Sequence, residues 1–197
     1  MKKYICIEGI IGSGKTTLAQ QIHQHFQTNS IHSTLLLERF EENKLLELFY
    51  QYPDKYKVLT EYSFLIDRFH QIYQHFQKVD NGITISDFYF RKCLWFAQNN
   101  LNHQQFQEFA KHYYQLEEDL NQSPDKIIFL DVKPELAFHN IQKRNRQIEK
   151  NITLNYLKNL YHTYIKHIEN IDIAIVNIQV NSYDRLMERV LQCIFDD

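Results

Sequence analysis

Short apolar runs alternate with longer amphipathic stretches along the whole chain. Five of these runs are apolar on both faces, as strands inside a parallel sheet are. They cover Tyr4–Glu8, Thr34–Glu38, Ile83–Asp87, Ile127–Val132 and Ile173–Ile178. The stretches between them predict helices over Lys15–Thr28, Lys44–Tyr52, Lys55–Val79, Tyr89–Leu120, Glu135–Arg146, Thr153–Asn170 and Tyr183–Phe195. This alternation predicts an α/β fold with a doubly wound, five-stranded parallel sheet and helices on both faces.

The first predicted strand leads directly into a glycine-rich motif. Residues 9–16 read G-I-I-G-S-G-K-T, which matches the phosphate-binding P-loop pattern G-x-x-x-x-G-K-[ST]. Three of the four glycines in the chain lie in this octet, which argues against a chance turn. In such loops backbone N–H groups and a lysine hold the phosphates, and a hydroxyl binds Mg²⁺. We therefore expect a nucleoside triphosphate with Mg²⁺ to bind at Gly9, Ile10, Ile11, Gly12, Ser13, Gly14, Lys15, Thr16 and Thr17, whereas the loop does not indicate what receives the phosphate.

Composition narrows the class of protein further. The 197 residues suit one domain, and 22 basic against 24 acidic residues indicate neither nucleic acid nor a membrane as a partner. No apolar run approaches the ~20 residues of a membrane span. The three cysteines are widely spaced, and the N-terminus enters a strand without a signal-peptide pattern. We expect a cytoplasmic protein with reduced thiols, and no metal site among its scattered histidines.

Acidic side chains end several of the predicted strands. Ligands of such sheets bind at the carboxyl ends of the strands, so these acids are candidates for chemistry. Two acids at neighbouring strand ends beside a P-loop suggest a base and a metal ligand. The residues are Glu8, Glu38, Asp87 and Asp131.

Several blocks in order along the chain are similar to one known family. They are the P-loop, Glu38–Asn43, Leu48-Phe49-Tyr50-x-x-Pro53, Glu61-x-x-Phe64-Leu65-x-x-Arg68, Ser86–Tyr89 with Phe96-Ala97, and Arg144-x-Arg146-x-x-Glu149. Together they resemble the deoxyribonucleoside kinases over nearly the whole chain, and this resemblance implies a sheet of the P-loop kinase type that binds ATP. Within that family, Asp87-Phe88-Tyr89 and Glu61 look most like the bacterial deoxyguanosine kinases.

The resemblance implies a role for each acid next to the P-loop. Glu38 matches the catalytic carboxylate, which orients a sugar 5′-hydroxyl and takes its proton; the alternative is a solvated acid at a strand end. Asp87 matches the acid on the metal side and would hold Mg²⁺ with Thr16; the alternative is a helix N-cap. The family has proline after the first acid, where this chain has Arg39.

The segment after the second acid also departs from the family, which often has Arg-Ser where this chain has Phe88-Tyr89. Another cation must then replace that arginine. The candidates are Arg39, Arg91 and the pair Arg144 and Arg146.

The resemblance also assigns a lid and a sugar clamp. Arg144 and Arg146 match a lid at about residues 140–152 that closes over the phosphates, or else they neutralise the C-terminus of a helix. Glu149 matches the residue that hydrogen-bonds the sugar 3′-hydroxyl. Tyr50 is its expected partner, unless it is a core aromatic.

Glu61 is the main indication of the base. Relatives that accept cytosine or adenine are expected to have glutamine here, whereas a carboxylate only accepts and suits the two neighbouring donors of guanine. Arg68 lies two helical turns further on and would donate to O6 or N7 of guanine. The alternative for Glu61 is an exposed ion pair on the helix.

These observations predict an ATP-dependent kinase for the 5′-hydroxyl of a purine deoxynucleoside, most simply deoxyguanosine. Its partners would be small-molecule substrates, and the family implies a homodimer. Alternatives are a deoxyadenosine or broad-specificity deoxynucleoside kinase, a nucleoside monophosphate kinase, and a non-catalytic P-loop nucleotide-binding regulator. The guanine motif and switch motif of GTPases do not occur in the sequence.

Overall fold

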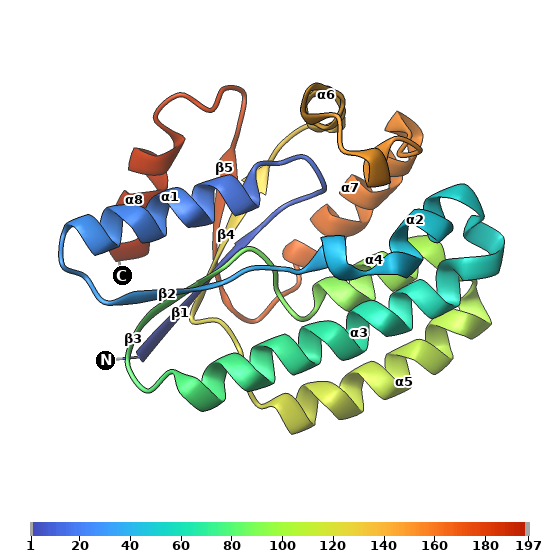
Figure 1. Cartoon of the computed structure of the whole chain (residues 1–197), viewed down its shortest axis with the longest axis horizontal. Coiled ribbons are helices and arrows are strands. Elements are labelled where there is room, and N and C mark those ends of the chain that lie inside the picture. Colours follow the sequence, from blue (N-terminus) through green and yellow to red (C-terminus); the bar gives the residue numbers. More distant parts are fainter. Residues whose placement is uncertain (1, 196–197) are drawn as a thin grey trace.

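The computed structural model describes residues 2–195 and has a parallel sheet at its centre (Figure 1). In this part of the chain the sheet has five strands in the order β2-β3-β1-β4-β5, and every neighbouring pair is parallel. The strands are β1 (Lys2–Glu8), β2 (Ser33–Leu36), β3 (Gly82–Ser86), β4 (Lys126–Asp131) and β5 (Ala174–Gln179). The predicted doubly wound α/β fold is confirmed.

Helices cover both faces of this sheet, as the apolar strands require. Figure 1 shows α1 and α8 on one side and α3, α4 and α5 on the other. The helices are α1 (Lys15–Thr28), α2 (Lys44–Gln51), α3 (Pro53–Lys78), α4 (Lys92–Asn100), α5 (His103–Leu120), α6 (Pro134–Arg144), α7 (Leu154–Ile168) and α8 (Leu186–Phe195). There are also two 3₁₀ turns: Phe40–Glu42 precedes α2, and Gln147–Glu149 lies between α6 and α7.

Aromatic side chains fill the core between the sheet and the helices. Trp95 of α4 and Tyr164 of α7 are almost fully buried, and their rings meet edge to face at 4.7 Å. Tyr164 also stacks near Phe129 of β4, with ring centroids 6.3 Å apart. This packing joins α4 and α7 to the central strands and holds the N-terminal half of α4 in the interior.

The predicted helix over Tyr89–Leu120 is wrong as one element. The chain forms α4 and α5 instead, with a break at Leu101 and Asn102. Asn102 caps α5: its side chain accepts from the N–H of Gln105, and the Gln105 side chain accepts from the N–H of Asn102. Such a capping box satisfies backbone N–H groups that are free only at the start of a helix, so it marks the beginning of a new helix.

The ends of several other strands and helices also differ from the predicted ones, and this changes where Glu38 and Arg146 lie. β2 ends at Leu36, two residues before Glu38, so that acid lies on the following loop. α6 ends at Arg144 because Asn145 adopts a left-handed conformation with φ 51°, which leaves Arg146 outside the helix. Pro53 does not follow a helix end directly but occupies the first turn of α3, where a missing N–H costs nothing. Within residues 2–195, each helix is too short or too polar to traverse a lipid bilayer.

Candidate active site

The loop between β1 and α1 has the conformation that its glycines predict. Gly12 and Gly14 have φ of 85° and 89°, and Gly14 stands at the N-terminus of α1. A Cβ on Gly12 would lie 2.4 Å from the carbonyl oxygen of Ala137, so no other residue fits there without movement. The loop thus directs the first N–H groups of α1 toward one point, which is how helix N-termini bind phosphate.

Lys15 folds back over this loop. Its Nζ donates to the carbonyl oxygens of Gly9 at 2.8 Å and Ile10 at 3.0 Å. Burial, together with the ammonium of Lys92, lowers the pKa of Lys15 to about 8. An anion at the loop would favour the charged form again, so the lysine is prepared for phosphate.

The two candidate magnesium ligands meet beside the loop. The Thr16 hydroxyl donates to Asp87 Oδ2 at 2.5 Å, and the backbone N–H of Glu38 donates to Asp87 Oδ1 at 2.8 Å. Burial, and then the nearby charge of Glu38, raise the pKa of Asp87. Asp87 does not cap a helix, because α4 begins only at Lys92. The acid instead joins the P-loop side of the site to the Glu38 loop.

The other acids at strand ends have different surroundings. Glu8 is fully buried, and its carboxylate accepts from the backbone N–H groups of Gly9 at 3.0 Å and Tyr89 at 2.7 Å. It therefore ties the P-loop to the segment that follows β3. Asp131 accepts from the Tyr161 hydroxyl at 2.7 Å and pairs with Lys133, and does not line the cavity described below.

Two buried cations hold the carboxylate of Glu38. Arg68 donates from Nε at 2.7 Å and Nη2 at 2.5 Å to Oε1, and Lys92 Nζ lies 2.6 Å from Oε2. The side chain of Glu38 is 10% exposed, which excludes the alternative of a solvated acid. Burial by itself would raise the pKa of Glu38, but Arg68 and Lys92 outweigh it and lower the pKa to about 2.

Arg68, which we expected to donate to guanine, instead donates to Glu38 in this structure. Its third guanidinium nitrogen, Nη1, lies 3.3 Å from Cys93 Sγ. All three nitrogens are thus engaged, although the side chain still lines the cavity. Its role on the guanine edge stays a prediction.

Lys92 was not anticipated from the sequence. Of the expected replacement cations, Arg39 pairs with Asp67 at 3.5 Å and Arg91 pairs with Glu117 at 2.8 Å. Lys92 is 5% exposed and lies directly on Glu38. The signal in the sequence was its position at the start of the apolar run Cys93–Ala97, where a lysine must find a buried partner.

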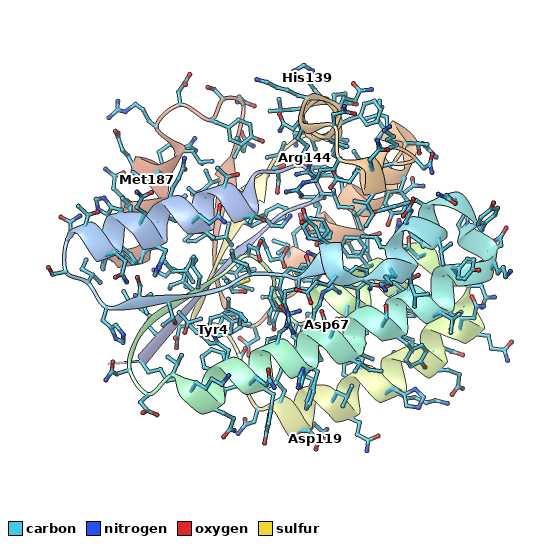
Figure 2. The ribbon with its side chains drawn as sticks, in the orientation of Figure 1. Tyr4, Asp67, Asp119, His139, Arg144 and Met187 are labelled. Atoms are coloured by element: carbon cyan, nitrogen blue, oxygen red, sulfur yellow. The ribbon has the colours of Figure 1, made fainter. Side chains whose placement is uncertain are left out.

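Glu149 and the two lid arginines form a cluster of ion pairs. Arg144 donates through Nε to Glu149 Oε2 at 2.7 Å and through Nη2 to Oε1, and Arg146 Nη1 lies 4.0 Å from Oε1. Figure 2 shows Arg144 near the loop that joins β1 to α1. Tyr50, the expected partner of Glu149, packs its ring edge to face against Tyr156 at 6.2 Å.

Glu61 of α3 also lines the site and is 2% exposed. Its Oε1 accepts from the Asn100 amide at 2.6 Å, whereas Oε2 and the Tyr156 hydroxyl are buried and lack hydrogen-bond partners in the described part of the chain. Burial raises the pKa of Glu61 to about 7. The exposed ion pair considered for Glu61 is therefore excluded.

One cavity of about 390 Å³ connects these groups. Its volume is within the usual range of small-molecule sites. Of the predicted ATP-binding residues, Gly9, Ile10 and Ser13 are buried within the loop and do not line it. The residues that line it include Ile11, Gly12, Gly14, Lys15, Thr16, Thr17, Glu38, Tyr50, Glu61, Arg68, Asp87, Lys92, Asn100, Arg144, Arg146, Glu149 and Tyr156.

A P-loop that shares a cavity with a buried carboxylate and a second polar end defines an enzyme that transfers phosphoryl groups to a bound acceptor. Comparison with known proteins agrees with this class. The chain belongs to the deoxynucleoside kinase family, because the model of that family, described as deoxynucleoside kinase, matches residues 5–194. The resemblance found in the sequence is confirmed, and the chain is a deoxynucleoside kinase.

Curated relatives include kinases for two different purine deoxynucleosides. Deoxyguanosine kinase of Bacillus subtilis (strain 168) is 31% identical over 94% of this chain and 90% of its own length. Deoxyadenosine kinase of Dictyostelium discoideum is 32% identical over 90% of this chain and 71% of its own. A solved structure of deoxyadenosine kinase from M. mycoides with bound dATP has a TM-score of 0.85, covers both chains fully and is 22% identical, which shows a shared fold.

Proposed function

We propose that this chain transfers the γ-phosphoryl group of ATP to the 5′-hydroxyl of a purine deoxynucleoside, with deoxyguanosine as the preferred acceptor. The observation that carries the proposal is that Lys15, Glu38 and Glu61 line one and the same cavity. It supplies a phosphate site, a proton acceptor and a polar edge for a base in one continuous space.

The donor half of the reaction uses the P-loop. The N–H groups at the start of α1 hold the β-phosphate, and Lys15 leaves the carbonyl oxygens of Gly9 and Ile10 to bind the β- and γ-phosphates. Arg144 and Arg146, both on the cavity wall, spread the charge of the transferring group.

Thr16 and Asp87 fit Mg²⁺, since both present oxygen atoms on the cavity wall and magnesium prefers a few such ligands together with phosphate. When bound, the ion would neutralise charge that develops between the β- and γ-phosphates.

Glu38 orients the acceptor hydroxyl. Because Arg68 and Lys92 lower its pKa to about 2, the carboxylate stays ionised and holds a proton only weakly. It accepts a hydrogen bond from the 5′-hydroxyl and takes the proton late, as the new bond to phosphorus forms and the bond from the γ-phosphorus to the leaving ADP breaks. This order suits a loose phosphoryl-transfer transition state, in which the nucleophile needs positioning more than deprotonation.

The sugar and the base occupy the rest of the cavity. Tyr50 and Glu149 hydrogen-bond the 3′-hydroxyl. The ionised form of Glu61 accepts hydrogen bonds from N1–H and N2–H₂ of guanine. Deoxyadenosine is the second candidate acceptor, because a deoxyadenosine kinase is as similar to this chain as a deoxyguanosine kinase.

The remaining features of the proposed kinase follow from the resemblance. Residues 1–197 form one domain with a lid at about residues 140–152. The enzyme is a cytoplasmic homodimer whose partners are ATP and a deoxynucleoside.

The test is incubation of the purified protein with Mg·ATP and each of the four deoxynucleosides, with the monophosphates separated by chromatography. Phosphorylation of deoxyguanosine at the highest kcat/KM supports the proposal. A higher value for a pyrimidine would overturn the purine assignment, and a higher value for deoxyadenosine would favour the second candidate.

A further inference from the structure

The two oxygens of the Glu61 carboxylate have different surroundings. Oε1 accepts from Nδ2 of Asn100 at 2.6 Å. The orientation of that amide is set in turn, because Asn100 Oδ1 accepts from Asn99 Nδ2 at 2.9 Å. Oε2 is buried in the cavity wall without a hydrogen-bond partner in the described residues. Oε2 is therefore the carboxylate oxygen whose hydrogen-bonding capacity is unused within the described residues.

Glu61 also lacks a cation of its own in residues 2–195. Arg68, on the same helix, uses its guanidinium on Glu38 and Cys93. The titratable groups that face Glu61 from other elements are neutral acids: Tyr50 of α2, Cys93 of α4 and Tyr156 of α7. Burial without an ion pair raises the pKa of Glu61 to about 7, although Asn100 and Arg68 lower it in part.

We propose that Glu61 and Asn100 select the purine by protonation, so that the ionised carboxylate accepts deoxyguanosine and the neutral carboxylic acid accepts deoxyadenosine. The proposal rests on the proposed function. Because Asn100 already donates to Oε1, the proton of the neutral acid resides on Oε2, the oxygen without a partner in the described residues.

The two states match the two purine edges. Guanine presents the donors N1–H and N2–H₂ side by side, and an ionised carboxylate only accepts. Adenine presents the acceptor N1 beside the donor N6–H₂. A neutral carboxylic acid donates from Oε2 to N1 and accepts at Oε1 from N6–H₂, as a glutamine amide would. One proton thus converts a guanine reader into an adenine reader.

The test measures kcat/KM for both nucleosides with the wild-type enzyme at about pH 6 and about pH 8, a range in which neither base titrates. The ratio of the two values cancels every effect that both substrates share, including those of ATP, Mg²⁺ and Glu38. Each unit of pH near the pKa changes the ionised-to-neutral ratio of Glu61 about tenfold, so the guanine-to-adenine ratio should rise roughly 100-fold between these values.

Three variants test the atoms involved. Glu61→Gln should favour adenine at every pH, with a ratio that no longer depends on pH. Asn100→Leu removes the hydrogen bond that stabilises the ionised form, so the midpoint of the change should move to higher pH. Gln98→Ala, an exposed change on the same helix, should keep the wild-type dependence.

A flat wild-type ratio, or no phosphorylation of deoxyadenosine at about pH 6, would overturn the inference while leaving the kinase activity in place. Phosphorylation of neither nucleoside would overturn the proposed function as well. The wild-type measurement needs no variant to fold.

Discussion

Lys92 Nζ lies 2.6 Å from Glu38 Oε2, while Arg68 Nη2 lies 2.5 Å from the other oxygen of the same carboxylate. Two cations therefore hold one buried acid in the cavity wall. Such a clamp prevents Glu38 from turning away from the acceptor, and it keeps the carboxylate ionised at neutral pH. The same clamp makes Glu38 a positioning group more than a strong base.

Replacing Lys92 with methionine should raise the pKa of Glu38, because burial remains while one of two cations is lost. Only the ionised carboxylate accepts the hydroxyl hydrogen bond, so kcat/KM should begin to fall at a higher pH than in the wild type as the solution is acidified. At neutral pH we expect a loss of roughly 10- to 100-fold. The measurement is the pH profile of kcat/KM. Lys111→Met, on the exposed surface of α5, is the matched control, and identical profiles for both variants would remove Lys92 from this role.

Glu38→Gln should reduce kcat by about 10²- to 10⁴-fold, with little change in the dissociation constant of ATP. The amide keeps the shape of the side chain but cannot take a proton. It also leaves Arg68 and Lys92 without their counter-charge, so the melting temperature should fall. Steady-state kinetics, ATP titration and a thermal melt separate these effects. Turnover close to that of the wild type would show that the reaction does not need this carboxylate.

Glu61 should make the free energy of unfolding depend on pH. Its pKa is raised from 4.5 to about 7 in the folded protein. The folded state therefore binds a proton more tightly than the unfolded state, and this stabilisation is complete below about pH 4.5 and lost as the pH rises through 7. The expected difference is roughly 3 kcal/mol. Urea denaturation at about pH 5 and pH 8 measures it, and Glu61→Gln should abolish this component of the dependence.

Tyr50→Phe tests the sugar clamp. Loss of one hydrogen bond should lower kcat/KM for deoxyguanosine by roughly 10-fold. A 2′,3′-dideoxynucleoside has no 3′-hydroxyl, so its already low kcat/KM should not change in the variant. An equal loss with both substrates would mean that the Tyr50 hydroxyl contributes to structure and does not bind the 3′-hydroxyl.

Much of the architecture could be predicted because it depends on local patterns. α1 has the predicted bounds, Lys15–Thr28, since the P-loop sets its start and the amphipathic pattern its length. The strands lie within two residues of their predicted limits because buried parallel strands are apolar on both faces. The break at Asn102 was also visible in principle, as asparagine three residues before glutamine, but a polar surface helix contains many such pairs.

The sequence indicated which residues belong to the candidate site but not which residues pair with one another. Glu38, Asp87 and Glu61, which the sequence predicts as site residues, line one cavity, and their roles stay predictions. Their partners were not predicted. Lys92 is 54 positions from Glu38, and a lysine on a helix ordinarily indicates solvent.

The sequence by itself therefore determined the class of fold, the phosphate loop and the family, because each of these depends on residues close together in the chain. Only the tertiary structure decided which partners these acids have. Arg68 and Lys92 both donate to the carboxylate of Glu38, and Asn100 donates to one oxygen of Glu61. These pairs form when α3 and α4 pack beside the loop after β2. The packing also removes water, and that desolvation moves the pKa of Glu38 and the pKa of Glu61 in opposite directions according to the partners each side chain finds.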